Sequence, residues 1–331
     1  MSDIITLGDG GVKVYGNVAK RLLANDMNIN ALRTNDTLQY DEWKEIDEAV
    51  VTMARQRLVL ANLLRSRGLV YSLPNGIAQT VLQWQTQSEF EDAEIDMDGL
   101  TKALQDRATY TTKTLPLPIV HKEFEISSRQ LSMSRKTGQP LDTTNAIEAS
   151  RKVSEMVEKL IINGSSSFAY ADATLYGLLD HADKNSVSCT THWDDAADSS
   201  GGGEEILNDA MSMITALHDA HFFGPYALLV PTKWGVALHK DFKANSDRSI
   251  YGRLMVIPTL ESIVTVDVMT ADRAVMFQLT PDVIQLVVGQ EPMTVEWEEQ
   301  GGFVHKFKVI ALMVPRIKSD DDGNCGVAVL A

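Results

Sequence analysis

Two histidines are the closest pair of metal-ligating side chains in this sequence. His218 and His221 are three residues apart, so on a helix they would share one face and could hold one metal ion together. The other five histidines are scattered, and neither an HExxH motif nor a third ligand at a diagnostic spacing accompanies the pair. We therefore expect no metal site.

An acidic run near the end of the chain imitates a calcium-binding loop. Asp320-Asp321-Asp322-Gly323-Asn324 matches the start of such a loop, but the sixth position is Cys325 and the twelfth is Ala331. An EF-hand loop needs glycine and glutamate at those positions. The run is therefore interpreted as a solvated turn.

Motifs of enzymes and cofactor sites are missing from the sequence. It contains no GxSxG elbow, no P-loop and no GxGxxG fingerprint. Cys189 and Cys325 lie far apart and form no CxxC pair. A catalytic triad is recognised by geometry, so a hydrolytic or metal-dependent enzyme stays open as an alternative, with loss of activity on chelation as its signature. We expect no enzyme and no cofactor.

The composition describes an acidic globular protein. The 331 residues are 44% hydrophobic and carry a formal net charge of −15. This charge argues against a dedicated nucleic-acid-binding protein, because phosphate binding needs a basic surface. No stretch approaches the roughly 18 apolar residues of a transmembrane helix, and the N-terminal residues show no basic region followed by an apolar run. We expect a soluble protein made in the cytoplasm, without a membrane partner.

The most regular pattern is a strand followed by a polar turn and a long helix. Residues Val120 to Ile126 alternate with the period of a half-buried strand. A helix is predicted from Asn145, with Glu148 as its capping-box partner, to the Asn163-Gly164 stop. Its apolar side is assigned as Ala146, Ala149, Val153, Met156, Val157, Leu160 and Ile161, and its polar side as Arg151, Lys152, Glu155, Glu158 and Lys159.

A long hairpin is predicted between residues 70 and 115. Val81 to Trp84 and Tyr110 to Thr114 are β-prone, and the tip between them is acidic. The acidic residues of the tip are Glu89, Glu91, Asp92, Glu94, Asp96 and Asp98. A two-stranded hairpin is marginal alone in water, so we expect it to lie on another surface.

The order of these pieces resembles that of the Hong Kong 97-type shell proteins, which include tailed-phage major capsid proteins and bacterial encapsulins. The resemblance is carried by Leu115-Pro116-Leu117, Phe124-Glu125-Ile126-Ser127, Arg129-Gln130-Leu131, the helix, Asn163-Gly164, and Leu175-Tyr176-Gly177-Leu178-Leu179. It implies an α+β fold of the Hong Kong 97 type, with an N-terminal arm, an extended β-hairpin loop, a peripheral domain with a long spine helix, and an axial domain. No single piece is specific, and their order carries the resemblance.

The resemblance also implies a domain plan. The expected parts are an arm at 1–40, an N-terminal helix at 41–67, the extended loop at 68–119, the peripheral domain at 120–185, the axial domain at 186–289, and return strands of the peripheral domain with the C-terminus at 290–331. Strand-like runs of the axial domain are Leu254 to Ile257, Ile263 to Val268, Ala274 to Phe277 and Val283 to Val288.

The function implied by the resemblance is that of a major capsid protein. Pentamers and hexamers of the chain would enclose the double-stranded DNA of a tailed phage without sequence-specific binding. We expect a virion protein assembled in the cytoplasm of a bacterial host, with scaffolding and portal proteins as partners and decoration proteins left open. The alternative is an encapsulin shell around cargo enzymes, since Tyr40 to Glu48 resembles the N-terminal helix of encapsulins.

Contacts between subunits are the candidate functional sites. One hypothesis is that the acidic tip of the hairpin docks on basic residues beside the spine helix of a neighbouring copy. The candidates are Arg129, Arg135, Lys136, Arg151 and Lys152. The alternative is a solvated loop. Lys102, Lys113 and Asn324 have the residue types of the isopeptide cross-link that joins some capsids of this fold, but they match no motif, so we expect no cross-link.

Overall fold

The computed structural model describes two compact units, each built from separate stretches of the chain. The described residues are 4–7, 12–15, 40–88, 97, 107–137, 143–171, 173–197, 202–243, 248–269, 272–299, 304–320 and 322–331. The first unit comprises Met1–Thr80, Leu117–Ile161 and Leu286–Pro315, and the second comprises Val81–Pro116, Ile162–Gln285 and Arg316–Ala331. The chain thus passes between the units several times.

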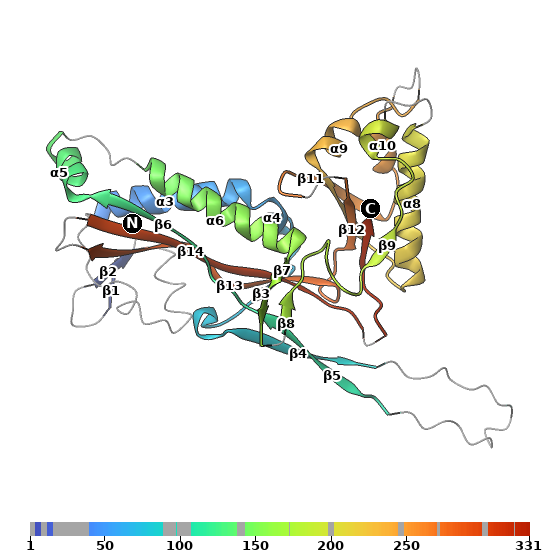
Figure 1. Ribbon diagram of the computed structural model, residues 1–331, viewed down its shortest axis with the longest axis horizontal. Helices are drawn as coiled ribbons and strands as arrows, with labels where there is room; N and C mark the ends of the chain where they lie inside the picture. Colours follow the sequence, from blue (N-terminus) through green and yellow to red (C-terminus); the bar gives the residue numbers. More distant parts are fainter. Residues whose placement is uncertain are drawn as a thin grey trace. The chain divides into compact units, whose positions relative to one another are not determined.

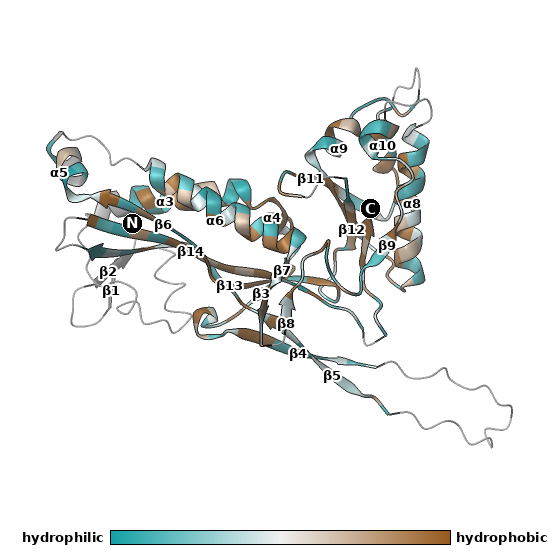
Figure 2. Ribbon diagram, viewed as in Figure 1, coloured by the Kyte–Doolittle hydropathy of each residue, from teal (hydrophilic) through white to brown (hydrophobic). Residues whose placement is uncertain are grey.

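The first unit is built on a four-stranded sheet with the order β3-β13-β14-β6. Its strands are β3 (Val70–Ser72), β6 (Val120–Ser127), β13 (Ile284–Glu299) and β14 (Val304–Ile317). β6 runs antiparallel to β14 and stacks Phe124 on the buried Phe307, with ring centroids 5.0 Å apart. The predicted strand at Val120 is thereby confirmed. Figure 2 shows the hydrophobic residues that run along β14.

Four helices are found among the described residues of the same unit (Figure 1). They are α3 (Tyr40–Arg57), α4 (Val59–Ser66), α5 (Ser128–Thr137) and α6 (Thr144–Asn163), although the last two residues of α6 fall in the second unit. The expected single N-terminal helix is two helices broken at Leu58. The expected polar turn before α6 contains the helix α5.

The long helix α6 agrees with its predicted length, but three details of the prediction were wrong. Asn145 lies inside the helix and is not its cap, because α6 begins at Thr144. Glu148 binds the Arg151 guanidinium of its own helix. Met156 is 43% exposed, whereas Glu158, assigned to the polar side, is 1% exposed.

A buried polar line explains the position of Glu158. Ser150, Ser154 and Glu158 follow one another at four-residue steps on α6, and each is at most 1% exposed. The Ser150 hydroxyl donates to the Val50 carbonyl of α3 at 2.8 Å, and Glu158 Oε1 accepts from the Leu60 backbone N–H of α4 at 2.7 Å. This face of α6 therefore binds the backbone of the two N-terminal helices.

The second unit contains a five-stranded sheet with the order β11-β10-β12-β15-β9. The strands are β9 (Asn185–Val187), β10 (Tyr226–Pro231), β11 (Leu260–Val266), β12 (Ala274–Gln278) and β15 (Val327–Leu330). The helices are α7 (Trp193–Ala196), α8 (Gly202–Asp219), α9 (Thr232–Ala237) and α10 (Ile250–Leu254). All residues of β10 and β12 are buried, as expected of central strands.

One position in this unit was not predicted and one expectation was wrong. β15 pairs with β12 and β9, so the end of the chain joins this sheet. Leu254 ends helix α10, and Met255 to Ile257 form a turn, not a strand. A run of four apolar residues does not distinguish a strand from a buried helix end.

Two further hairpins belong to the second unit, and a third lies at the N-terminus. β4 (Val81–Gln87) pairs with β5 (Tyr110–Pro116), and β7 (Ser165–Tyr170) pairs with β8 (Ala173–Leu175). β1 (Ile4–Leu7) pairs with β2 (Val12–Tyr15). A short 3-10 helix at Gly76–Ala78 precedes β4.

Candidate functional site

The hairpin of β4 and β5 is the first candidate surface. Its register runs from Val81 opposite Pro116 to Gln87 opposite Tyr110. Leu115 and Pro116 are buried at its base, whereas Tyr110 is 64% exposed. The predicted hairpin is confirmed over these strands. The six acidic residues predicted for its tip lie outside the described residues.

The part of β4 from Trp84 to Gln87 borders a cavity of about 540 Å³ in the second unit. Trp84 lines it, with the Arg316 guanidinium 5.7 Å from the indole centroid. The Lys318 ammonium donates to the Pro281 carbonyl, and burial lowers the pKa of Lys318, helped by the nearby Arg316 charge.

The carboxylate of Asp320 accepts from the backbone N–H and the side-chain amide of Asn324. The acidic run thus closes a turn on itself, as the sequence predicted.

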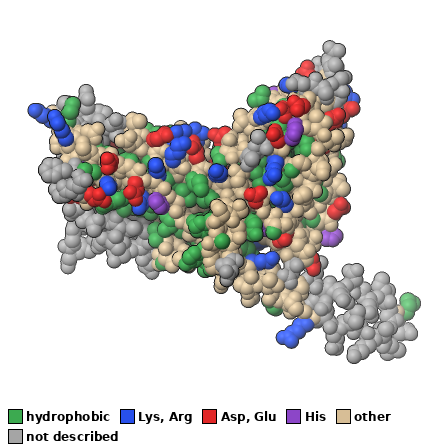
Figure 3. All heavy atoms as spheres, in the orientation of Figure 1, with side chains coloured by type: hydrophobic (Ala, Val, Ile, Leu, Met, Phe, Trp, Pro, Cys, Tyr) green, Lys and Arg blue, Asp and Glu red, His purple; other side chains and the backbone are tan. Residues whose placement is uncertain are grey.

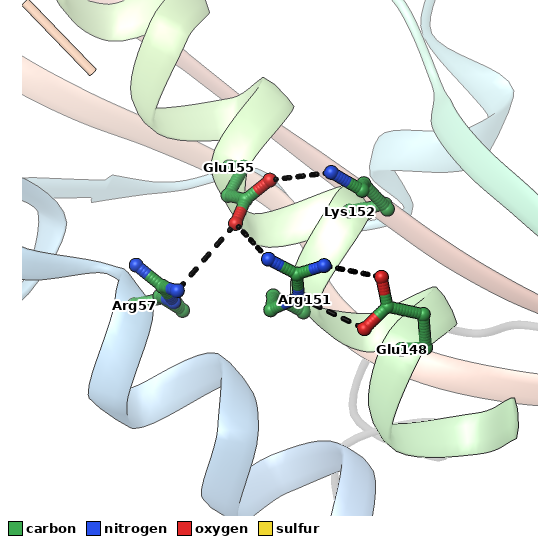
Figure 4. Close-up of polar contacts among 5 residues, drawn as sticks. All are labelled: Arg57, Glu148, Arg151, Lys152 and Glu155. Carbon is green, nitrogen blue, oxygen red and sulfur yellow. Dashed lines mark hydrogen bonds and ion pairs between the residues drawn. The ribbon is translucent and has the colours of Figure 1, made fainter. Parts of the chain in front are cut away.

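Two of the five predicted basic residues already have acidic partners within the chain (Figure 4). Arg151 binds Glu148 through two nitrogens and Glu155 at 3.1 Å, and Lys152 binds Glu155 at 3.2 Å. Arg57 of α3 approaches Glu155 at 3.7 Å. The Arg151 hydrogen bond lowers the pKa of Glu148. These five charges sum to +1, so this cluster offers little free positive charge to a partner.

Helix α5 presents the remaining basic candidates. Arg129 and Lys136 are exposed, and the side chain of Arg135 lies outside the described residues. The sequence of α5 contains no acidic residue. In Figure 3 the blue side chains at the place of α5 stand apart from the red ones. The acidic residues predicted to bind α5 lie outside the described residues, so the docking contact stays a prediction.

The histidine pair lies among aromatic rings. His218 is in α8, and its ring centroid lies 5.3 Å from that of Phe223 and 6.3 Å from that of Tyr226. His221 has a left-handed backbone with φ of 65° and lines the cavity beside Trp84. Among the described residues, no group of three His, Cys, Asp or Glu side chains is placed to hold a metal ion.

Both cysteines have weakly acidic thiols. Burial, with a contribution from Asp209, raises the pKa of Cys189 to about 11, and burial raises that of Cys325 to about 12. A nucleophilic cysteine needs the opposite shift, because the thiolate is the reactive form. The environments of both thiols therefore disfavour nucleophilic reactivity.

Buried carboxylates are the groups that sequence reasoning missed. Asp209 of α8 is 7% exposed and accepts from the Trp193 indole N–H at 3.0 Å. Burial raises the pKa of Asp209, and the hydrogen bonds from Trp193 and Cys189 partly oppose that shift. Its position between Asn208 and Ala210 on a helix carries no signal of this contact, since Trp193 belongs to another element.

None of the described helices is both long and apolar enough to span a bilayer.

Sequence comparisons find a family model and a relative that match most of this chain. A model described as "Family of unknown function (DUF6260)" matches residues 30–329. The type 1 encapsulin shell protein EncA of Myxococcus xanthus is 22% identical over 289 residues, which cover 86% of this chain and 91% of that protein.

Two solved structures are similar over most of the chain. A virus-like particle protein from Pyrococcus furiosus matches with a TM-score of 0.61 and 20% identity, over 88% of this chain and 99% of the other. The capsid protein of Myoviridae phage XM1 matches with a TM-score of 0.59 and 15% identity, over 80% and 90%. The chain therefore has the mixed helix-and-strand fold of Hong Kong 97-type shell proteins, as the order of its sequence pieces predicted.

Proposed function

We propose that this chain, which belongs to the family of unknown function DUF6260, is a subunit of a self-assembling protein shell. The observation that carries the proposal is the likeness of its fold to a virus-like particle over 88% of the chain. The exposed outer end of the β4–β5 hairpin supports it, because a two-stranded hairpin gains stability by lying on another surface. The proposed work is mechanical, through complementary surfaces, and involves no catalytic step.

The finer proposal is a tailed-phage major capsid protein. Its pentamers and hexamers would enclose double-stranded DNA in a virion assembled in the bacterial cytoplasm, with scaffolding and portal proteins as partners. The likeness to the phage XM1 capsid and the long acidic hairpin segment favour it. A net charge of −15 suits a wall that must not adhere to packaged DNA.

The second candidate is an encapsulin, a shell around cargo proteins. One specific observation favours it: the likeness to EncA is detectable in sequence and spans 86% of this chain. The two candidates share the shell and differ in its contents.

Among the basic residues of the docking hypothesis, those of helix α5 are the better candidates for the contact on the neighbouring copy. Segment 89–98 carries six acidic and no basic residues, and the α5 sequence carries three basic and no acidic ones. Because Arg151 and Lys152 already bind Glu148 and Glu155, α5 is the surface with the better charge complementarity. We expect the acidic segment of one copy to bind α5 of the next.

Electron microscopy of the protein expressed alone and purified at low salt tests the shell. Closed particles of uniform size are expected, and their contents, DNA or protein, distinguish the two candidates. If the chain alone gives only monomers or rings, it should close into shells when co-expressed with the genes adjacent to its own. Failure in both settings would refute the shell.

Charge reversal tests the docking contact separately. Glu91→Lys with Asp92→Lys should impair assembly, and so should Arg129→Glu with Lys136→Glu. Combining all four changes should restore it, since the charges are then exchanged. Lys159→Glu, at an exposed position of α6, is the matched control and should assemble normally. Normal assembly of either double variant would contradict the contact.

A further inference from the structure

The β7–β8 hairpin has a rigid base. Gly164 and Gly177 face each other so closely that a Cβ on Gly177 would lie 2.2 Å from the Gly164 nitrogen. Leu179 donates its N–H to the Ile162 carbonyl, and the Asn163 side-chain amide donates to the Val268 carbonyl. These contacts hold the start of the hairpin against the body of the second unit.

Beyond this base, β7 makes an unusual bulge. Ser165 pairs with Leu175 and Ala169 pairs with Thr174, so three residues of β7 have no counterpart on β8. Those residues are Ser166, Ser167 and Phe168. Bulges re-aim side chains, and here an aromatic ring sits on the bulged segment.

Three aromatic side chains on or beside the hairpin are partly exposed to solvent in the single chain. Phe168 is 39% exposed, Tyr170 is 50% exposed, and Tyr176, just after β8, is 39% exposed. The only charged residue between Gly164 and Gly177 is Asp172. Exposed aromatics without charge are the composition of protein–protein interface cores, and a rigid element loses little entropy on binding. A segment without a basic residue is poorly suited to bind nucleic acid.

We propose that the β7–β8 hairpin is a contact between subunits, with Phe168 and Tyr170 packing on a second copy of this chain. The inference rests on the proposed shell function, in which a second copy is the partner always present at high local concentration. The area also fits such a role. A buried aromatic contributes about 150–250 Å², so the exposed parts of three rings offer about 200–300 Å². A stable dimer needs about 800 Å² per partner, so this contact acts together with others in a closed assembly.

A pair of exposed substitutions tests the contact. Phe168→Asp with Tyr170→Asp should leave the thermal unfolding of the unassembled protein unchanged and raise the threshold concentration for assembly about tenfold or more. Met211→Asp is the control, because Met211 is 45% exposed on α8 and outside the hairpin. It should leave the threshold within about twofold. If wild type and the double variant assemble at the same threshold, the hairpin contact is wrong while the shell stands. If wild type assembles under no condition, the shell itself fails.

Photo-cross-linking identifies the partner directly. A benzophenone amino acid in place of Phe168 should, on illumination of assembled particles, give a product of twice the chain mass. The same probe at Met211 should give little of that product. A product with a different protein, or none between copies, would overturn the proposal even if the double aspartate variant failed to fold.

Discussion

Glu158 is predicted to hold α4 in place on the spine helix. Leu60 is the second residue of α4, and the residue before that helix, Leu58, has no side chain able to cap it. The Glu158 carboxylate accepts the Leu60 N–H at 2.7 Å in a site where both residues are at most 1% exposed. It therefore serves as a cap supplied from 98 residues away.

Glu158→Ala should lower the free energy of unfolding by about 2–3 kcal/mol. A buried N–H left without an acceptor costs about 1–3 kcal/mol, and loss of a helix cap costs about 0.5–2 kcal/mol, with overlap between the two. Glu158→Gln keeps an acceptor oxygen for the Leu60 N–H in a side chain of nearly the same shape, so it should cost less than about 1 kcal/mol.

Urea denaturation of the unassembled protein, followed by circular dichroism, measures both variants. Glu148→Ala is the control on the same helix, since Glu148 is exposed and forms its ion pair with Arg151 at the protein surface. It should change the urea midpoint far less. An alanine variant as stable as wild type would refute the reasoning. Equal losses for alanine and glutamine would show that the charge, and not the acceptor, is what matters.

Two further predictions concern the second unit. Gly177→Ala should lower the free energy of unfolding by at least about 2 kcal/mol, because the new Cβ would meet backbone atoms 2.2 and 2.6 Å away. Gly68→Ala is the control, because a Cβ there would meet nothing within 4 Å. It should cost only about 1 kcal/mol, for the φ of 71°. Melting temperatures compare the two, and equal shifts would contradict the predicted steric cause. Burial raises the pKa of Asp209, so the folded state holds this proton to higher pH than the unfolded chain, and this group's contribution to stability falls as pH rises from about 4 through the raised value. Asp209→Asn should therefore gain stability relative to wild type between pH 4 and pH 7 in urea titrations, and parallel pH profiles would exclude that role.

Local patterns predicted the elements that depend on neighbours in sequence. The period of α6, the Asn163-Gly164 stop and the alternation of β6 each arise from residues within a few positions of one another. Their order was enough to predict the fold that the structural comparisons show. For the docking residues the sequence predicted only their charge, because it does not show that Arg151 already pairs with Glu148 and Glu155.

The sequence by itself determined the acidic charge, the helix and strand periods and the order of pieces, because all of these are properties of composition and short range. Tertiary structure alone decided that Glu158 is buried and Met156 exposed on the same helix, and that the C-terminal strand joins the sheet of β12. A helical period shows which residues share a face. Whether a polar residue on that face is buried depends on a partner such as the Leu60 N–H, which the fold brings from a distant part of the chain.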